Sequence, residues 1–143
     1  THVAATIELT SGVIATLVAS FDVAATRHRN IEVYGTEGTL SVPDPNSFDG
    51  PVTVRRLGDA EWVPIELRPA TISQQRGIGV AEMAWATSTG RPHRASGDLA
   101  LHAVDVMASA VTAAHERQTL DLTTTCTKPP LLAEGLPPNT FDD

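Results

Sequence analysis

Asp98 and His102 are the pair of residues whose spacing most resembles an acid–base site. Four positions apart in a region of helical periodicity, they lie on one helix face. A carboxylate that orients a histidine is an arrangement found in general-base catalysis. The alternative, which we favour, is that both residues are structural. Asp98 would then suit the positive end of the helix dipole, and His102 would be a partly buried, hydrogen-bonded histidine.

Gly77-Ile78-Gly79 precedes a predicted helix and resembles the first part of a dinucleotide-binding loop. The third glycine of that pattern is replaced by Glu82, and no apolar strand runs into the loop. We therefore expect a hinge-like helix entry without bound cofactor. The five histidines form no zinc-binding spacing, and the single cysteine, Cys126, cannot build a Cys-rich site, so no metal site is predicted.

Arginine is concentrated in three short clusters, 27–29, 55–56 and 91–94. The guanidinium group holds carboxylates and phosphates through two-point contacts, so each cluster is a possible anion or polar-substrate contact. Ion pairing with acidic residues at the surface is the alternative, and we favour it except at His93-Arg94, where the two interpretations are balanced. One hypothesis for the function is therefore an anion-binding regulatory domain, although we favour it less than the two hypotheses given at the end of this section.

The elements that would position these residues are strands first and helices afterwards. Alternating apolar residues predict strands at 3–9, 13–22, 30–34, 39–42, 52–57 and 62–67, and a further short strand at 119–122. Helical spacing begins near Ile78 with the face of Val80, Met83 and Ala84, and ends at Gly90. A second helix follows an N-cap at Ser96 and carries an apolar stripe, namely Leu99, Ala103, Val106, Ala110 and Ala114.

This order predicts an α+β fold: an open, mostly antiparallel sheet with two helices packed on one face. The other face, which mixes polar and apolar side chains, would be available for packing on another subunit or domain, although an ordinary wetted face is the alternative. It would carry Thr6, Glu8, Ile14, Thr16, Val18 and Ser20. We expect residues 1–126 to form this domain and residues 127–143 to form a Pro-rich tail.

Composition narrows the class of protein. The 143 residues carry a formal net charge of −7, which argues against a nucleic-acid binder. No apolar run is long enough to span a membrane, and one cysteine indicates a cytoplasmic protein without internal disulfides. The chain opens directly into a strand pattern at Thr1, as expected of a piece excised from a longer protein.

Residues 11–22 and 31–40, followed by 76–84, 90–97 and 99–107, resemble the C-terminal domain of the Gfo/Idh/MocA oxidoreductases in order and spacing. The resemblance covers most of residues 1–141 and implies an N-terminal Rossmann domain, absent from this chain, that holds NAD or NADP. It also implies hydride transfer on a sugar, polyol or related hydroxy/keto substrate, and subunit contacts through the open sheet face, hence a homo-oligomer.

The family's Glu-Lys-Pro and Asp-x-x-x-His motifs are not in place here, so no catalytic residue is transferred and the segment alone is not expected to be active. The polar residues expected to line a substrate pocket are Asp44, Asn46, Arg76, His93 and Arg94. A stand-alone, non-catalytic interaction module that uses the exposed sheet face is the alternative function.

Overall fold

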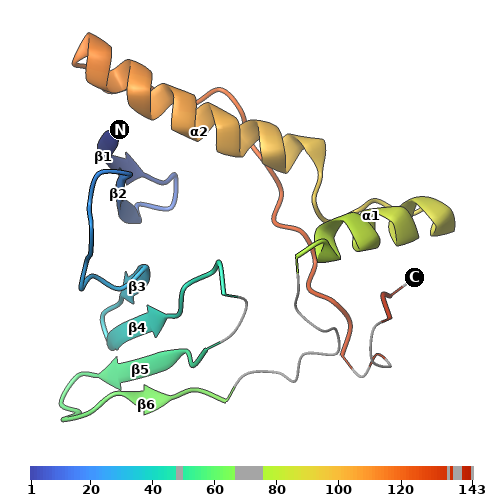
Figure 1. Cartoon of the computed structure of the whole chain (residues 1–143), viewed down its shortest axis with the longest axis horizontal. Coiled ribbons are helices and arrows are strands. Elements are labelled where there is room, and N and C mark those ends of the chain that lie inside the picture. Colours follow the sequence, from blue (N-terminus) through green and yellow to red (C-terminus); the bar gives the residue numbers. More distant parts are fainter. Residues whose placement is uncertain (48–49, 67–75, 135, 137–139, 143) are drawn as a thin grey trace. The chain divides into compact units, whose positions relative to one another are not determined.

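The computed structural model describes residues 1–47, 50–66, 76–134, 136 and 140–142, and it confirms the α+β class with open antiparallel sheets (Figure 1). The strands fall into two sheets, however, where the sequence predicted one. The first sheet pairs β1 with β2, and the second has the order β3-β4-β5-β6. The elements are β1 (His2–Glu8), β2 (Ile14–Ser20), β3 (Ile31–Tyr34), β4 (Gly38–Val42), β5 (Thr53–Arg56), β6 (Val63–Pro64), α1 (Ile78–Thr89) and α2 (Gly97–Glu116).

The chain divides into two compact units, each with one sheet and one helix. Unit 1 comprises Thr1–Thr26 and Arg94–Pro130, and therefore contains β1, β2 and α2. Unit 2 comprises Arg27–His93 and Leu131–Asp143, and contains the four-stranded sheet and α1. The segment predicted as a tail thus contributes residues to both units, and the predicted domain boundary after residue 126 stays a prediction.

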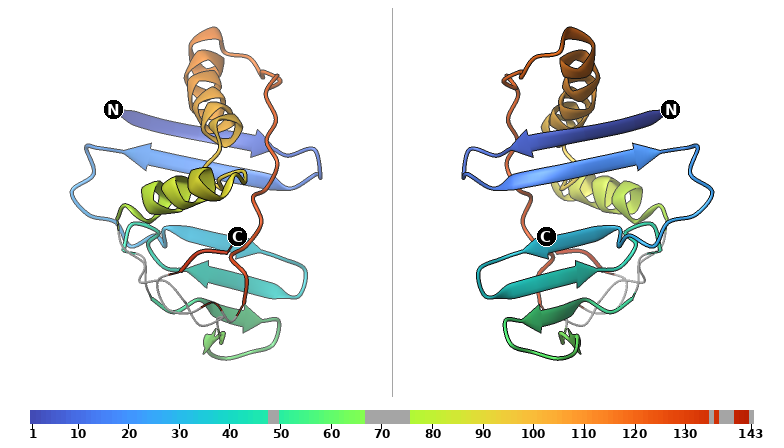
Figure 2. Two further views of the ribbon diagram at one scale, coloured as in Figure 1. Left: turned by 90° about the vertical axis from the view of Figure 1, so that its right-hand side faces the viewer. Right: turned by 90° about the vertical axis from the view of Figure 1, so that its left-hand side faces the viewer.

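β1 and β2 form an antiparallel hairpin (Figure 2), and its side chains alternate between two faces. The register pairs Glu8 with Ile14 and Thr6 with Thr16, so these side chains share one face. Ile14 is 67% exposed and Val18 is 65% exposed on that face. On the other face the β1 side chains are half-buried, whereas those of β2 are exposed, with Leu17 40% exposed. The hairpin therefore presents an open, partly apolar face.

The four-stranded sheet depends on one close backbone approach. A Cβ atom on Gly38 would lie 2.5 Å from the backbone oxygen of Arg55, so a side chain there would push β4 and β5 apart. β6 is shorter than the predicted strand 62–67, of which residue 67 lies outside the described residues. Pro64 has no backbone N–H to donate to the neighbouring strand. Four cross-strand neighbours form an apolar row on this sheet, namely Val33, Leu40, Val54 and Val63.

α1 ends as predicted but faces the opposite way. Gly90 adopts a φ of 74°, and its N–H and that of Arg91 donate to carbonyl oxygens of the last turn, which closes the helix. The predicted inward stripe of Val80, Met83 and Ala84 is wrong, because Val80 is 72% exposed. The buried residues are Glu82 and Ala86 on the other side of the helix. α1 buries a charged contact, described below, in place of an apolar stripe.

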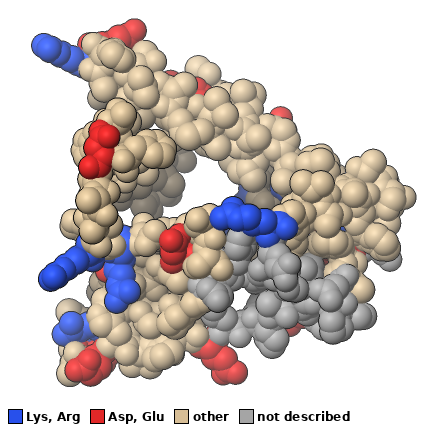
Figure 3. All heavy atoms as spheres, in the orientation of Figure 1, with Lys and Arg blue, Asp and Glu red and all other residues tan. Residues whose placement is uncertain are grey.

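α2 begins at the predicted cap, where Ser96 Oγ accepts a hydrogen bond from Leu99 N at 3.2 Å. It runs beside the β1–β2 hairpin in unit 1 (Figures 1 and 2). Of the predicted stripe, Leu99, Val106 and Ala110 are half-buried, whereas Ala103 and Ala114 are exposed. A second, exposed side is also apolar and consists of Leu101, Val104, Met107 and Val111. Much of the surface over α2 is accordingly uncharged in Figure 3.

Residues 119–122 are not a strand, contrary to the prediction. Their backbone forms no ladder, and the segment is instead joined to α2 by the side chain of Thr124. A pattern of β-forming residues specifies a strand only when a sheet edge lies within reach. Within the described residues, neither helix combines the length and apolar character needed to cross a bilayer.

Candidate functional site

Three of the five predicted substrate contacts lie together in unit 2. Asp44 follows β4 and its Oδ1 accepts a hydrogen bond from the backbone N of Asn46 at 2.9 Å, while its carbonyl oxygen accepts from Ser47. This turn fixes the backbone of Asn46, whose Oδ1 accepts a hydrogen bond from Arg76 Nη2 at 2.6 Å. The structure therefore joins two polar side chains separated by thirty positions in the sequence.

His93 and Arg94 are the other two predicted contacts. Nδ1 of His93 is buried and makes no hydrogen bond to any described residue. Arg94 Nε donates to the carbonyl oxygen of Pro130 at 2.9 Å, a contact within unit 1. His93 belongs to unit 2 and Arg94 to unit 1, and the grouping of all five residues in one pocket stays a prediction.

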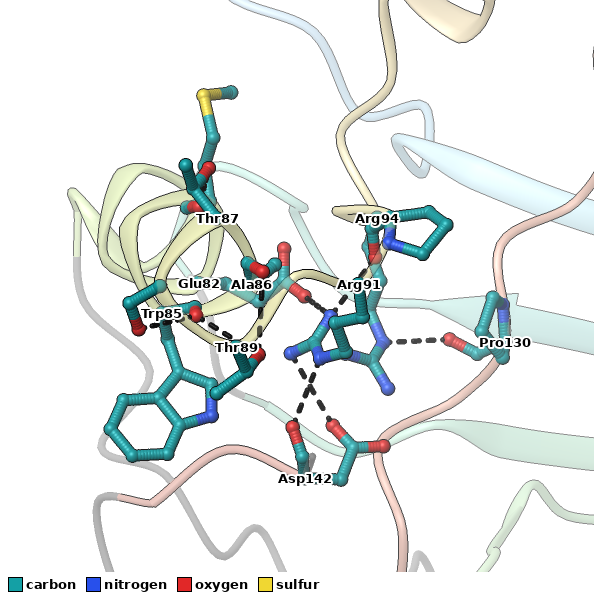
Figure 4. A network of polar contacts seen from close by, with 12 residues as sticks. Glu82, Trp85, Ala86, Thr87, Thr89, Arg91, Arg94, Pro130 and Asp142 are labelled. Atoms are coloured by element: carbon teal, nitrogen blue, oxygen red, sulfur yellow. Dashed lines mark hydrogen bonds and ion pairs between the residues drawn. The ribbon is translucent and has the colours of Figure 1, made fainter.

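Arg91 is the centre of a part-buried polar network (Figure 4). Its Nη1 donates to Glu82 Oε1 at 2.7 Å and to the carbonyl oxygen of Pro92 at 3.1 Å. Its Nε donates to the carbonyl oxygen of Asp142 at 3.0 Å. Glu82 is only 5% exposed. The guanidinium therefore neutralises a buried carboxylate of α1 and connects that helix to the C-terminal segment.

His102 bonds to Thr124 and not to Asp98, so the structural alternative for the Asp98–His102 pair is confirmed. Nδ1 of the half-buried His102 lies 2.9 Å from Thr124 Oγ1, and that hydroxyl donates to Asp105 Oδ2 at 2.6 Å. A threonine hydroxyl has one proton, which goes to Asp105, so Nδ1 of His102 must be the donor in the other bond. In this network Nδ1 of His102 therefore carries a proton.

Asp105 gives this network a definite pH dependence. The hydrogen bond from Thr124 chiefly lowers the pKa of the Asp105 carboxyl, and Ser109 and the nearby His102 add to the effect. A carboxyl whose pKa is lower in the folded state stabilises the fold above its ordinary pKa of 3.8. This contribution is lost as the pH falls below 3.8 and through the lower folded-state pKa.

We therefore expect Asp105→Asn to flatten the acid limb of a plot of unfolding free energy against pH, measured by urea denaturation between about pH 2 and 5. Asp121→Asn, which removes an exposed carboxylate from the same unit, is the matched control. Equal acid limbs for Asp105→Asn and the unsubstituted chain would show that this carboxyl does not titrate as described.

Three residues of these networks, Glu82, Asp105 and Thr124, were not identified from the sequence as members of a polar network. Glu82 was noted only as the wrong residue for a phosphate loop, and Asp105 and Thr124 were not singled out. The helical spacing of His102, Asp105 and Ser109 was a signal that they share a face. Nothing in the spacing of nineteen residues indicated that Thr124 would return to Asp105.

The helix entry at Gly77 does not fit NAD or NADP. Gly77 adopts a φ of 94°, but the position of the third loop glycine is taken by the buried, ion-paired Glu82. The third glycine of the motif allows a helix and a strand to pack closely, and the larger side chain of Glu82 occupies that space. Within the described part of the chain, no three His, Cys, Asp or Glu side chains are grouped in a way that could hold a metal ion.

No protein-family model matches the chain, and no curated protein and no solved structure is significantly similar to it. The function is therefore inferred from the contacts described here and from the sequence itself.

Proposed function

We propose that the chain is the substrate-side and oligomerisation domain of an NAD(P)-dependent oxidoreductase. The reaction would transfer a hydride between the nicotinamide and a sugar, polyol or related hydroxy/keto compound. Support comes from the resemblance of residues 11–22, 31–40, 76–84, 90–97 and 99–107 to the Gfo/Idh/MocA C-terminal domain. Because the Gly77 entry does not fit a dinucleotide, the cofactor would bind to a Rossmann domain outside this chain.

The observation that carries the substrate part is the contact between Asn46 and Arg76. Their hydrogen bond of 2.6 Å holds an amide and a guanidinium side by side on the exposed surface, next to the turn at Asp44. A hydroxyl both donates and accepts hydrogen bonds, so a polyol can accept from the amide or guanidinium and donate to the amide oxygen. The pair would bind and orient substrate hydroxyls, which is a positioning role.

Titration with myo-inositol or sorbitol tests this proposal. We expect the side-chain amide resonance of Asn46 to shift in NMR spectra, and Arg76→Met to weaken binding roughly tenfold, because one charge-assisted hydrogen bond is lost. Arg55→Met removes an arginine of the same unit whose Nε donates to the Asp59 carbonyl, and it serves as the control.

An unshifted Asn46 amide at saturating polyol would contradict the substrate part of the proposal. The stand-alone interaction module, in which the open face serves a partner without any enzymology, would then be the better account. Equal affinities for the unsubstituted chain and Arg76→Met would likewise place any polyol binding elsewhere.

The assembly part rests on the open face of the β1–β2 hairpin. Ile14 and Val18 are both about two-thirds exposed, and they share a face with Thr6 and Thr16. A two-stranded hairpin is marginally stable in water unless something packs on it. We propose that a second copy of the chain covers this face, and the test is given in the Discussion.

The compartment proposed for the protein is the cytoplasm. Cys126 is a free thiol on an exposed residue, and the sequence offers no second cysteine to pair with it. An exposed free thiol is compatible with a reducing compartment, where thiols are kept from oxidation.

A further inference from the structure

The side chain of Arg91 uses its hydrogen-bond donors unevenly. A guanidinium has five N–H donors, and the two on Nη1 are directed to Glu82 and Pro92. The single donor on Nε goes to the carbonyl oxygen of Asp142. Nη2 is buried and makes no hydrogen bond to any residue that the structure describes.

Nε and Nη2 form one edge of the guanidinium, and both face the same residue. The Nε bond to the Asp142 carbonyl oxygen is 3.0 Å long, whereas Nη2 lies 3.7 Å from Asp142 Oδ1 (Figure 4). The second distance is too long for a hydrogen bond. Asp142 thus presents two oxygens to this edge, one well placed and one not.

A carboxylate or phosphate places two oxygens about 2.2–2.5 Å apart within one rigid group and can bond both N–H groups of such an edge at about 2.8 Å. Such a ligand would therefore satisfy Nη2, which Asp142 does not. The charge balance permits the exchange: a monoanion that displaces the Asp142 carboxylate leaves the same net charge beside Arg91 and Glu82.

We propose that the Nε/Nη2 edge of Arg91 is a binding site for a small oxyanion, a carboxylate or a phosphate, and that Asp142 is its built-in competitor. Arg91, Asp142 and the ion-pair partner Glu82 all belong to unit 2, so the site lies within one compact part of the protein. The side chains of Arg91 and Asp142 are 17% and 23% exposed, so an anion would reach this edge by displacing the side chain of Asp142. The proposal is independent of the oxidoreductase function.

Titration of the full chain with inorganic phosphate and with acetate tests the site and separates the two ligand types. The readout is the side-chain Nε–H resonance of Arg91 in NMR spectra, assigned by through-bond correlation to the backbone resonances of Arg91. We expect saturable shifts with at least one anion and about tenfold tighter binding in Asp142→Asn, in which the competing charge is gone. Acetamide, which has the shape of acetate without the charge, should produce no shift.

Arg91→Lys keeps a positive charge for Glu82 but lacks the planar edge, so saturable binding should disappear. Arg55→Lys, at an exposed arginine of the same unit whose Nε donates to the Asp59 carbonyl, is the matched control and should bind as the unsubstituted chain does. If neither anion shifts Arg91 Nε–H in Asp142→Asn, or if that variant binds no more tightly than the unsubstituted chain, the proposal is wrong. Both outcomes remain readable even if Arg91→Lys does not fold.

Discussion

Replacing Arg91 with methionine is expected to lower the free energy of unfolding by about 3–5 kcal/mol, since breaking a buried ion pair leaves one charge without compensation. The stranded group is Glu82, which is 5% exposed and accepts its ion-pair hydrogen bond from Arg91 at 2.7 Å. The loss should appear as a lower urea midpoint, or as an unfolded chain at 25 °C if the starting stability is small. Circular dichroism measures both.

A double substitution separates the buried charge from the packing of the side chain. In Glu82→Leu/Arg91→Met the ion pair is replaced by apolar groups of similar volume, which typically restores most of the stability. Arg94→Met removes an arginine whose Nε donates to a backbone carbonyl, and should cost much less than Arg91→Met. A double variant as unstable as Arg91→Met would contradict the view that the uncompensated charge of Glu82 causes the loss.

The second large effect is expected at the open face of the β1–β2 hairpin. The unsubstituted chain should form a dimer in sedimentation experiments, and Val18→Glu should weaken the dimer at least about a hundredfold. Val18 is 65% exposed in the single chain and would be covered in the dimer. A carboxylate buried there without a partner costs about 3 kcal/mol or more, which is roughly a hundredfold in the dissociation constant.

Val23→Glu is the control for this substitution. Val23 is 55% exposed and follows the hairpin, outside both of its strands. The same change of charge should therefore leave the dimer intact. Equal weakening by both substitutions would indicate a general effect of net charge, and would remove the specific role of the open face.

Local physical chemistry explains why the ends of the helices and the faces of the hairpin were predictable. The caps at Ser96 and Gly90 depend on hydrogen bonds and on φ values set within a few residues. The faces of β1 and β2 follow from the alternation of side chains along a strand. The turn at Asp44 and Asn46 also has a local cause, because residues 43–47 are all turn formers.

The predictions failed where a distant partner decides the outcome. The sequence shows Val80, Met83 and Ala84 as the apolar face of the helix, but α1 buries Glu82 because Arg91 binds it there. The expected strand at 119–122 is instead a return segment whose Thr124 hydroxyl bonds to Asp105. Spacing along the chain contains no information about which remote segment supplies such a partner.

Cross-linking between copies tests the assembly proposal most directly. Thr16→Cys places a thiol on the open face, and Ala15→Cys places one on the opposite face of the same strand. Each is made together with Cys126→Ser and treated with a short bismaleimide. The account predicts covalent dimers for Thr16→Cys and monomers for Ala15→Cys. Cross-linking through Ala15→Cys alone, or through neither position at concentrations where the chain is fully dimeric, would contradict it, as would a chain that stays monomeric.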